Sequence, residues 1–145
     1  MTLPKTTAPM PVALRIDHAG ASVANLEAST RFYCEVLGFA VEEHFQIPST
    51  PVRGAVLINA VGTRVELFCR PDSLALPSGH PIESTRQRGW FQLAFAVDDL
   101  ATTYSQVLER GARSVKPPFC APDGRAQVAF IADPDGHLIE LIQRQ

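Results

Sequence analysis

The chain has few of the features that mark nucleic-acid-binding, membrane or exported proteins. Its 145 residues carry 13 Lys and Arg against 15 Asp and Glu, a net charge of −2, with no basic run. A basic patch attracts nucleic acid and anionic membranes, so we expect neither as a partner. No apolar segment approaches the roughly 20 residues of a membrane span. Residues 1–12 contain three prolines and no apolar block, which predicts a flexible N-terminal arm without a signal peptide, and a cytoplasmic protein.

Cysteine is also scarce. Cys34, Cys69 and Cys120 are odd in number and show no C-x-x-C spacing. In a chain without an export signal such residues are reduced thiols. A catalytic cysteine needs an activating base, and the sequence indicates none.

The most informative stretch that is present is I-A-D-P-D-G-H-L-I-E-L-I at residues 131–142. Residues 133–136 predict a tight turn, so the following residues form a strand in which Leu138, Glu140 and Ile142 share one face. A carboxylate among apolar neighbours is costly to bury unless a positive group meets it. Glu140 is therefore a candidate metal ligand, ion-pair partner or catalytic base.

The same arrangement occurs earlier in the chain, which predicts a twofold internal repeat. Glu66 and Glu140 are 74 positions apart, and so are His18 and Gln92. The segment "HAGASVANL" thereby overlays "QLAFAVDDL". Each half carries one metal-capable residue on its first strand and a Glu on its last, 48 positions apart. Such a repeat is best sought before any single element is interpreted.

Hydrophobic periodicity and turn residues predict one strand, one helix and three strands in each half. Asn25 and Asp98 or Asp99 are the expected helix caps, and Gly38 and Gly111 the expected ends. The predicted strands are 14–23, 39–47, 52–60, 64–69, 91–97, 114–119, 126–132 and 137–143, with helices over 26–37 and 100–108. The fold class is α+β, with a βαβββ module at 13–70, a Pro-rich linker at 71–88 and a second module at 89–145.

The strand at 91–97 has a clean alternation, with Phe91, Leu93, Phe95 and Val97 on one face. Gln92 and two alanines lie on the other face, which is what a ligand pocket requires. The first strand is less regular, because Asp17 and Ala19 stand where Phe91 and Leu93 do.

Four residues at equivalent positions, His18, Glu66, Gln92 and Glu140, predict a metal site. If the halves pair about a pseudo-twofold axis, within one chain or across a dimer, these side chains converge. One imidazole, one amide oxygen and two carboxylates suit a six-coordinate divalent ion such as zinc, nickel, cobalt or manganese.

The chain resembles the vicinal oxygen chelate superfamily, which includes glyoxalase I, bleomycin resistance proteins and dioxygenases. The resemblance covers nearly the whole chain and is strongest in "FYCEVLGF", "VELF", "QLAFAVDDL" and "DPDGHLIELI". It implies paired βαβββ modules that form a curled, barrel-like mixed sheet around a divalent metal. His18, Glu66, Gln92 and Glu140 match the four ligand positions. Gln92 departs from the usual His, but glyoxalase I uses both residues.

That resemblance implies a metal-dependent lyase or isomerase acting on a hemithioacetal or another α-hydroxycarbonyl through an enediolate. Glu140 is then the leading base, Glu66 its counterpart, and zinc or nickel the expected ion. It also implies a small-molecule substrate, for example a thiol adduct, and a homodimer. Arg88 matches a position where some glyoxalase I enzymes carry a glutathione-contacting Arg, and Arg70 and Arg88 could hold another anionic group. Trp90 is a further candidate substrate residue, although it is expected first in the core or the pocket wall.

Two other functions remain open within the same fold. A metal-free binding protein, like the bleomycin-sequestering members, generally lacks the ligand set that His18, Glu66 and Glu140 complete. An iron-dependent extradiol dioxygenase uses two histidines and one glutamate, and Gln92 disfavours it. The four-ligand set most resembles glyoxalase I.

Overall fold

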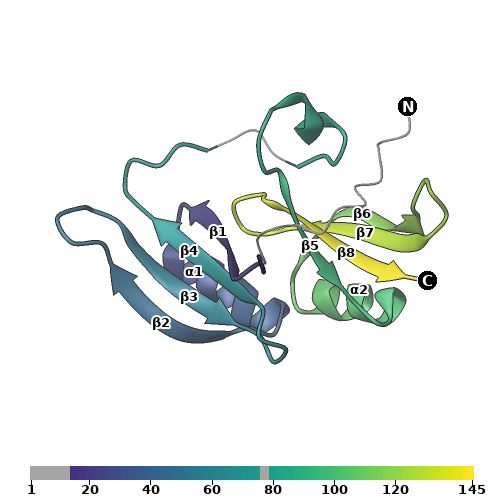
Figure 1. The fold of residues 1–145 in the computed structure, drawn as a ribbon, viewed down its shortest axis with the longest axis horizontal. Helices are drawn as coiled ribbons and strands as arrows, with labels where there is room; N and C mark the ends of the chain where they lie inside the picture. The colour runs from purple at the N-terminus through teal and green to yellow at the C-terminus, as the bar shows by residue number, and fades with distance from the viewer. Residues whose placement is uncertain (1–13, 76–78) are drawn as a thin grey trace.

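The computed structural model describes residues 14–75 and 79–145, and the arm expected at residues 1–12 lies outside them. Two four-stranded sheets lie side by side, and a helix accompanies each of them (Figure 1). Both halves run strand, helix and three strands, with a short 3-10 helix between them. This is the predicted α+β arrangement of two βαβββ modules.

The first sheet has the order β1-β4-β3-β2 and the second the order β5-β8-β7-β6. In each sheet the first and last strands of the module are parallel neighbours, and the other neighbours are antiparallel. The elements of the first module are β1 (His18–Val23), α1 (Leu26–Arg31), a π-helical turn (Phe32–Val36), β2 (Ala40–Gln46), β3 (Arg53–Ile58) and β4 (Arg64–Cys69). A 3-10 helix, Glu83–Arg86, precedes β5 (Gln92–Ala96), α2 (Leu100–Glu109), β6 (Arg113–Cys120), β7 (Ala126–Ala132) and β8 (Leu138–Arg144).

Local chemistry accounts for where the helices begin and end. The Asn25 side chain accepts from Ala28 N at 2.9 Å, and Asp99 accepts from Thr102 N at 3.0 Å, so each cap satisfies a free helix amide. Gly38 and Gly111 follow the helices with φ of 76° and 102°, which favours glycine. The expected helix over 26–37 instead changes to a π-helical turn at residue 32. Among the described residues, no helix is long and apolar enough to cross a membrane.

The two modules share one apolar core, formed on the helix-covered faces of the sheets. It joins Val23, Leu26 and Leu67 of the first module to Leu100 and Ile131 of the second. The rings of Phe39 and Phe95 meet across the modules at 5.8 Å, a contact typically worth about 0.5–1.5 kcal/mol beyond its buried area.

Because this core occupies the helix-covered faces, the two sheets do not close into a barrel within the described chain. β1 and β5 each lie at a sheet edge and pair with one neighbour only. The expected barrel-like closure around a site is therefore wrong for a single chain. We call the faces opposite the helices the open faces. They carry His18, Gly20, Ser22, Arg64, Glu66 and Phe68 in the first module and Gln92, Ala94, Ala96, Leu138, Glu140 and Ile142 in the second. In the second module this face also holds a small apolar cluster of Ala126, Val128, Phe130 and Leu138.

The β7–β8 turn (residues 133–137) is built around one buried carboxylate. Asp133 is 3% exposed, and its Oδ1 accepts from Asp135 N at 3.0 Å and His137 N at 2.8 Å. The first module has the same turn, in which Asn59 Oδ1 accepts from Val61 N and Thr63 N. An oxygen acceptor at this position therefore shapes the turn in both repeats.

Among the described residues, only the second module's turn also forms side-chain hydrogen bonds to the other module. Asp135 accepts from Ala24 N at 3.0 Å and from Ser29 Oγ at 3.3 Å, and Asp133 accepts from the buried Tyr33 hydroxyl at 3.3 Å. Burial and the Asp133 charge raise the pKa of Tyr33 well above its usual value. Tyr33 therefore stays protonated and donates, and the turn links β8 to the start of α1.

Asp135→Ala should lower the free energy of unfolding by about 1–3 kcal/mol, because two hydrogen bonds between the modules are lost. Urea denaturation checks this. Asp123→Ala is the matched control, since Asp123 occupies another Pro-Asp-Gly turn but accepts only from the nearby Arg125 N. Equal losses in the two variants would contradict a specific role for the contact between modules.

His137 should make stability depend on pH. Its Nδ1 lies 2.7 Å from Asp133 Oδ2, and this hydrogen bond raises the pKa of His137 above its usual 6.5. A raised folded-state pKa stabilises the protein fully below the unfolded pKa, and this contribution is lost as the pH rises through the folded pKa. His137→Thr introduces the residue found at the equivalent Thr63. Urea denaturation measures the difference in unfolding free energy between wild type and this variant. That difference should be larger at about pH 6 than at about pH 9. A difference that grows with pH would contradict this.

Candidate metal centre

The first candidate pair, His18 and Glu66, is brought together by the parallel pairing of β1 with β4. Gly20 lies opposite Glu66 in the register, so His18 is two residues before that position and on the same open face. His18 Nε2 lies 3.0 Å from Glu66 Oε2. The His18 side chain is 44% exposed and that of Glu66 is 23% exposed. Both are accessible from the open face.

The second pair repeats this geometry on β5 and β8. Ala94 lies opposite Glu140, and Gln92 is two residues before Ala94. Gln92 Nε2 donates to Glu140 Oε2 at 2.6 Å. The predicted alternation of β5 is confirmed, since Gln92, Ala94 and Ala96 are exposed and the residues between them are partly buried. The spacing of 48 residues thus has the same structural result in both modules.

The two pairs do not meet within one chain. Among the described residues, the one cluster of three His, Cys or acidic side chains with ligand atoms within 4.8 Å of one another is Asp133, Asp135 and His137. His18, Glu66 and Glu140 form no such cluster in that part of the chain. Each module therefore carries half of the predicted ligand set, and the metal role of these residues stays a prediction.

Each half fits a divalent ion by its chemistry. Adjacent ligand atoms on a six-coordinate ion with bonds of about 2.1 Å are about 3 Å apart, close to the 3.0 Å between His18 Nε2 and Glu66 Oε2. Glu140 lies at a similar distance from the Gln92 amide. A half-turn of that amide exchanges Nε2 for Oε1, the atom that binds a cation. The donor set therefore suits an ion with mixed nitrogen and oxygen ligands.

His18 is held on its other side by Asp17, which is not among the predicted ligands. His18 Nδ1 lies 2.8 Å from Asp17 Oδ2. This hydrogen bond, and then the negative charge of Glu66, raise the pKa of His18, while the same bond lowers the pKa of Asp17. The break in alternation at position 17 was the signal that could have identified this contact.

The Asp133, Asp135 and His137 cluster is structural. Its carboxylate oxygens already accept from Tyr33, Ser29 and backbone amides, as described above. The sequence predicted the turn but not its contacts with α1, because residues 100 positions apart share no local pattern.

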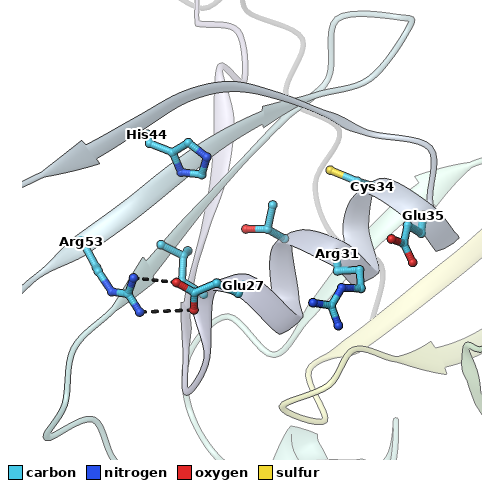
Figure 2. Close-up of a pocket in the computed structure, with 8 residues that line it drawn as sticks. Glu27, Arg31, Cys34, Glu35, His44 and Arg53 are labelled. Atoms are coloured by element: carbon cyan, nitrogen blue, oxygen red, sulfur yellow. Dashed lines mark hydrogen bonds and ion pairs between the residues drawn. The ribbon is translucent and has the colours of Figure 1, made fainter.

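A hollow of about 370 Å³ lies elsewhere, between α1 and the strands β2 and β3 (Figure 2). Glu27 and Arg53 form an ion pair at 2.6 Å on its wall, and Cys34 and His44 also line it (Figure 2). Arg53 and His44 pair in register with Cys69 and Ala55, which are buried on the helix-covered side. The hollow is therefore on the opposite face from His18 and Glu66.

Aromatic side chains line the open face beside each candidate pair. The rings of Phe45 and Phe68 lie 5.4 Å apart, and Phe45 crosses Gly54, where a Cβ atom would overlap the ring. In the second module Phe119 and Phe130 lie 6.2 Å apart, and Phe130 is opposite Glu140. Each pair of polar ligands thus adjoins an apolar wall.

The candidate substrate residues flank the strands that carry the candidate ligands. Arg70, directly after β4, forms a two-pronged ion pair with Asp72, at 2.5 and 2.8 Å. Arg88 and Trp90 are exposed in the segment before β5, and Trp90 is 103% exposed. The expectation that Trp90 packs in the core is therefore wrong, because no neighbouring element covers it in a single chain. The substrate roles of these three residues stay predictions.

Comparison with known proteins agrees with this architecture. Residues 15–141 match the model of the Glyoxalase/Bleomycin resistance protein/Dioxygenase superfamily. The chain is 28% identical to a probable lactoylglutathione lyase from Synechocystis over 87% of this chain and 92% of that protein. It is 30% identical to a lactoylglutathione lyase from Neisseria meningitidis serogroup A over 91% and 92%.

Among solved structures, glyoxalase I from Zea mays superposes with a TM-score of 0.69 at 25% identity. The match covers 90% of this chain but 44% of the maize chain, so the protein spans less than half the length of that enzyme. Because the family model covers most of the sequence and the paired βαβββ modules are those of its structural relatives, the chain belongs to the glyoxalase/bleomycin resistance protein/dioxygenase superfamily.

Proposed function

We propose that the protein is a metal-dependent lyase or isomerase of the glyoxalase type, acting on a hemithioacetal or a similar α-hydroxycarbonyl. The observation that carries this proposal is the repeated donor pair, His18 with Glu66 and Gln92 with Glu140, at equivalent positions on two open faces. Relatives named lactoylglutathione lyase support the same reaction class. The proposed ion is zinc or nickel, with cobalt and manganese as alternatives.

A complete site requires two copies of the chain. β1 and β5 are sheet edges with unpaired backbone groups on one side, which favours pairing with another strand. Large apolar side chains lie exposed just before both strands, with Ile16 94% and Trp90 103% exposed. A twofold dimer is self-complementary, so a contact between the first module of one copy and the second module of the other occurs twice and forms two equivalent sites. We propose that this homodimer joins the two halves of the ligand set.

A reaction of this class requires the transfer of a proton between two adjacent carbons of the substrate. When bound, the ion would supply positive charge to the two substrate oxygens as negative charge develops on them. Glu140 is the proposed base, which removes the proton from one carbon and returns it to its neighbour. Glu66 is its counterpart on the opposite side of the site. The aromatic walls of Phe45 with Phe68 and of Phe119 with Phe130 would hold the apolar part of the substrate and exclude water.

The proposed substrate is a small carbonyl compound carried as a thiol adduct. Glutathione is the candidate thiol because of the relatives' names. Arg88 and Trp90 precede β5 and would approach the site from its rim. Arg70 is already paired with Asp72, so it would contact an anionic group of the adduct only by exchanging that partner.

Purified protein should contain a stoichiometric divalent ion by elemental analysis and should convert a methylglyoxal–thiol adduct. Glu140→Gln should reduce kcat by at least about 100-fold, because loss of a catalytic base typically costs 10²–10⁴-fold. Glu109→Gln, an exposed carboxylate on α2 of the same module, is the control and should leave turnover unchanged.

Three outcomes would reject the proposal. Protein that retains no ion after dialysis against zinc or nickel would indicate a metal-free binding protein. Oxygen consumption with catechols would indicate a dioxygenase. Full turnover by Glu140→Gln would remove Glu140 from the mechanism.

Subunit mixing tests whether the site is shared between copies. Glu66→Gln and Glu140→Gln homodimers should each be nearly inactive, since every site carries the change. After the two are unfolded together and refolded, a heterodimer has one doubly substituted site and one intact site. Random assembly should therefore restore about one quarter of wild-type activity. A site built within one chain would restore none, and that result would reject the shared arrangement.

A further inference from the structure

Asp17 is the point at which the repeat departs most clearly from its pattern. The equivalent position in the second module is Phe91, and residues 17 and 91 each directly precede the strand that carries a candidate ligand. An apolar residue is expected there because its neighbours in the alternation pack inward. The Asp17 side chain is instead 78% exposed and contacts His18.

The contact constrains the imidazole ring. An ionised carboxylate only accepts hydrogen bonds, so the ring nitrogen facing Asp17, Nδ1, carries a proton. The other nitrogen, Nε2, lies 3.0 Å from Glu66 Oε2, so in the absence of an ion the charged ring carries a proton on this nitrogen as well. A histidine binds a cation through an unprotonated nitrogen, and the single remaining proton then lies on the other nitrogen. Asp17 is placed to accept that proton and to keep Nε2 directed at the site.

The nearby Arg64 does not compete with His18 for the Asp17 carboxylate. Arg64 lies opposite His18 in the register. Its guanidinium makes two hydrogen bonds of 2.7 Å to Glu42. Arg64 therefore contributes positive charge near Asp17 without removing its oxygen from His18.

The second module has no need of an equivalent residue. Gln92 is positioned directly by its hydrogen bond to Glu140. An amide has no tautomers, and a half-turn of the side chain exchanges its oxygen and nitrogen. Phe91 can therefore be apolar where Asp17 is not.

We propose that Asp17 is a positioning residue that fixes the ring orientation and tautomer of His18, so that Nε2 is presented to a divalent ion. The metal part of this inference rests on the proposed function. Carboxylates that accept the second proton of a ligand histidine typically change metal affinity by 10–100-fold.

The variants are Asp17→Ala, which removes the acceptor, and Asp17→Asn, which keeps an oxygen acceptor without the charge. Asp123→Ala is the control, since Asp123 lies in an exposed turn of the other module. The first measurement is the ¹⁵N spectrum of the histidine side chains in metal-free protein, with His18 assigned by comparison with His18→Gln. Wild type, Asp17→Asn and Asp123→Ala should carry the neutral-ring proton on Nδ1, and Asp17→Ala should carry it on Nε2, facing Glu66.

The second measurement is titration calorimetry with Zn²⁺ alone. Asp17→Ala should bind about 10–100-fold more weakly than wild type, whereas Asp17→Asn should stay within a few-fold and Asp123→Ala should be unchanged. An Nδ1 proton retained in Asp17→Ala would overturn the inference, as would equal losses in Asp17→Ala and Asp17→Asn. If wild type binds neither Zn²⁺ nor, in a second titration, Ni²⁺, the proposed function fails, while the ¹⁵N spectra still decide whether Asp17 positions the ring.

Discussion

The parallel pairing of the first and last strands in each module is the constraint on which the candidate site depends. Residues 48 positions apart become neighbours only because β1 lies beside β4 and β5 beside β8 in matching registers. A shift of one residue in either register would turn the Glu side chain to the helix-covered face. On that face it would lie in the apolar core, where an unpaired carboxylate is costly. Core packing and site geometry therefore favour the same register.

Packing of the shared core determines which surfaces of the chain remain for contact with a second copy. Both modules bury their helix-covered faces in one cluster, and within the described residues the outer edges of β1 and β5 pair with no further strand. Exposed backbone edges with adjoining apolar side chains are surfaces that proteins usually cover. A second copy of the chain would cover them and would also unite the two donor pairs. Stability and function would then both depend on assembly.

The two modules have kept a common frame and diverged in their polar details. Asn59 and Asp133 shape equivalent turns, but only the turn of Asp133 contacts the other module. Asp17 contacts a ligand candidate, while Phe91 at the equivalent position does not. In both cases one carboxylate replaces a neutral side chain and forms contacts that its counterpart cannot form. Duplicated modules can thus acquire separate structural roles without any change of topology.

The sequence by itself determined the module architecture, the capped helix starts and the equivalence of His18 with Gln92 and of Glu66 with Glu140. These follow from local periodicity, turn residues and a repeat of constant offset, which the linear order of residues contains. Only the tertiary structure decided that the sheets stay open in one chain, that the donor pairs lie apart, and that Asp133 and Asp135 link the modules. Those outcomes depend on which apolar faces pack together and on contacts between residues about 100 positions apart, which no local pattern encodes.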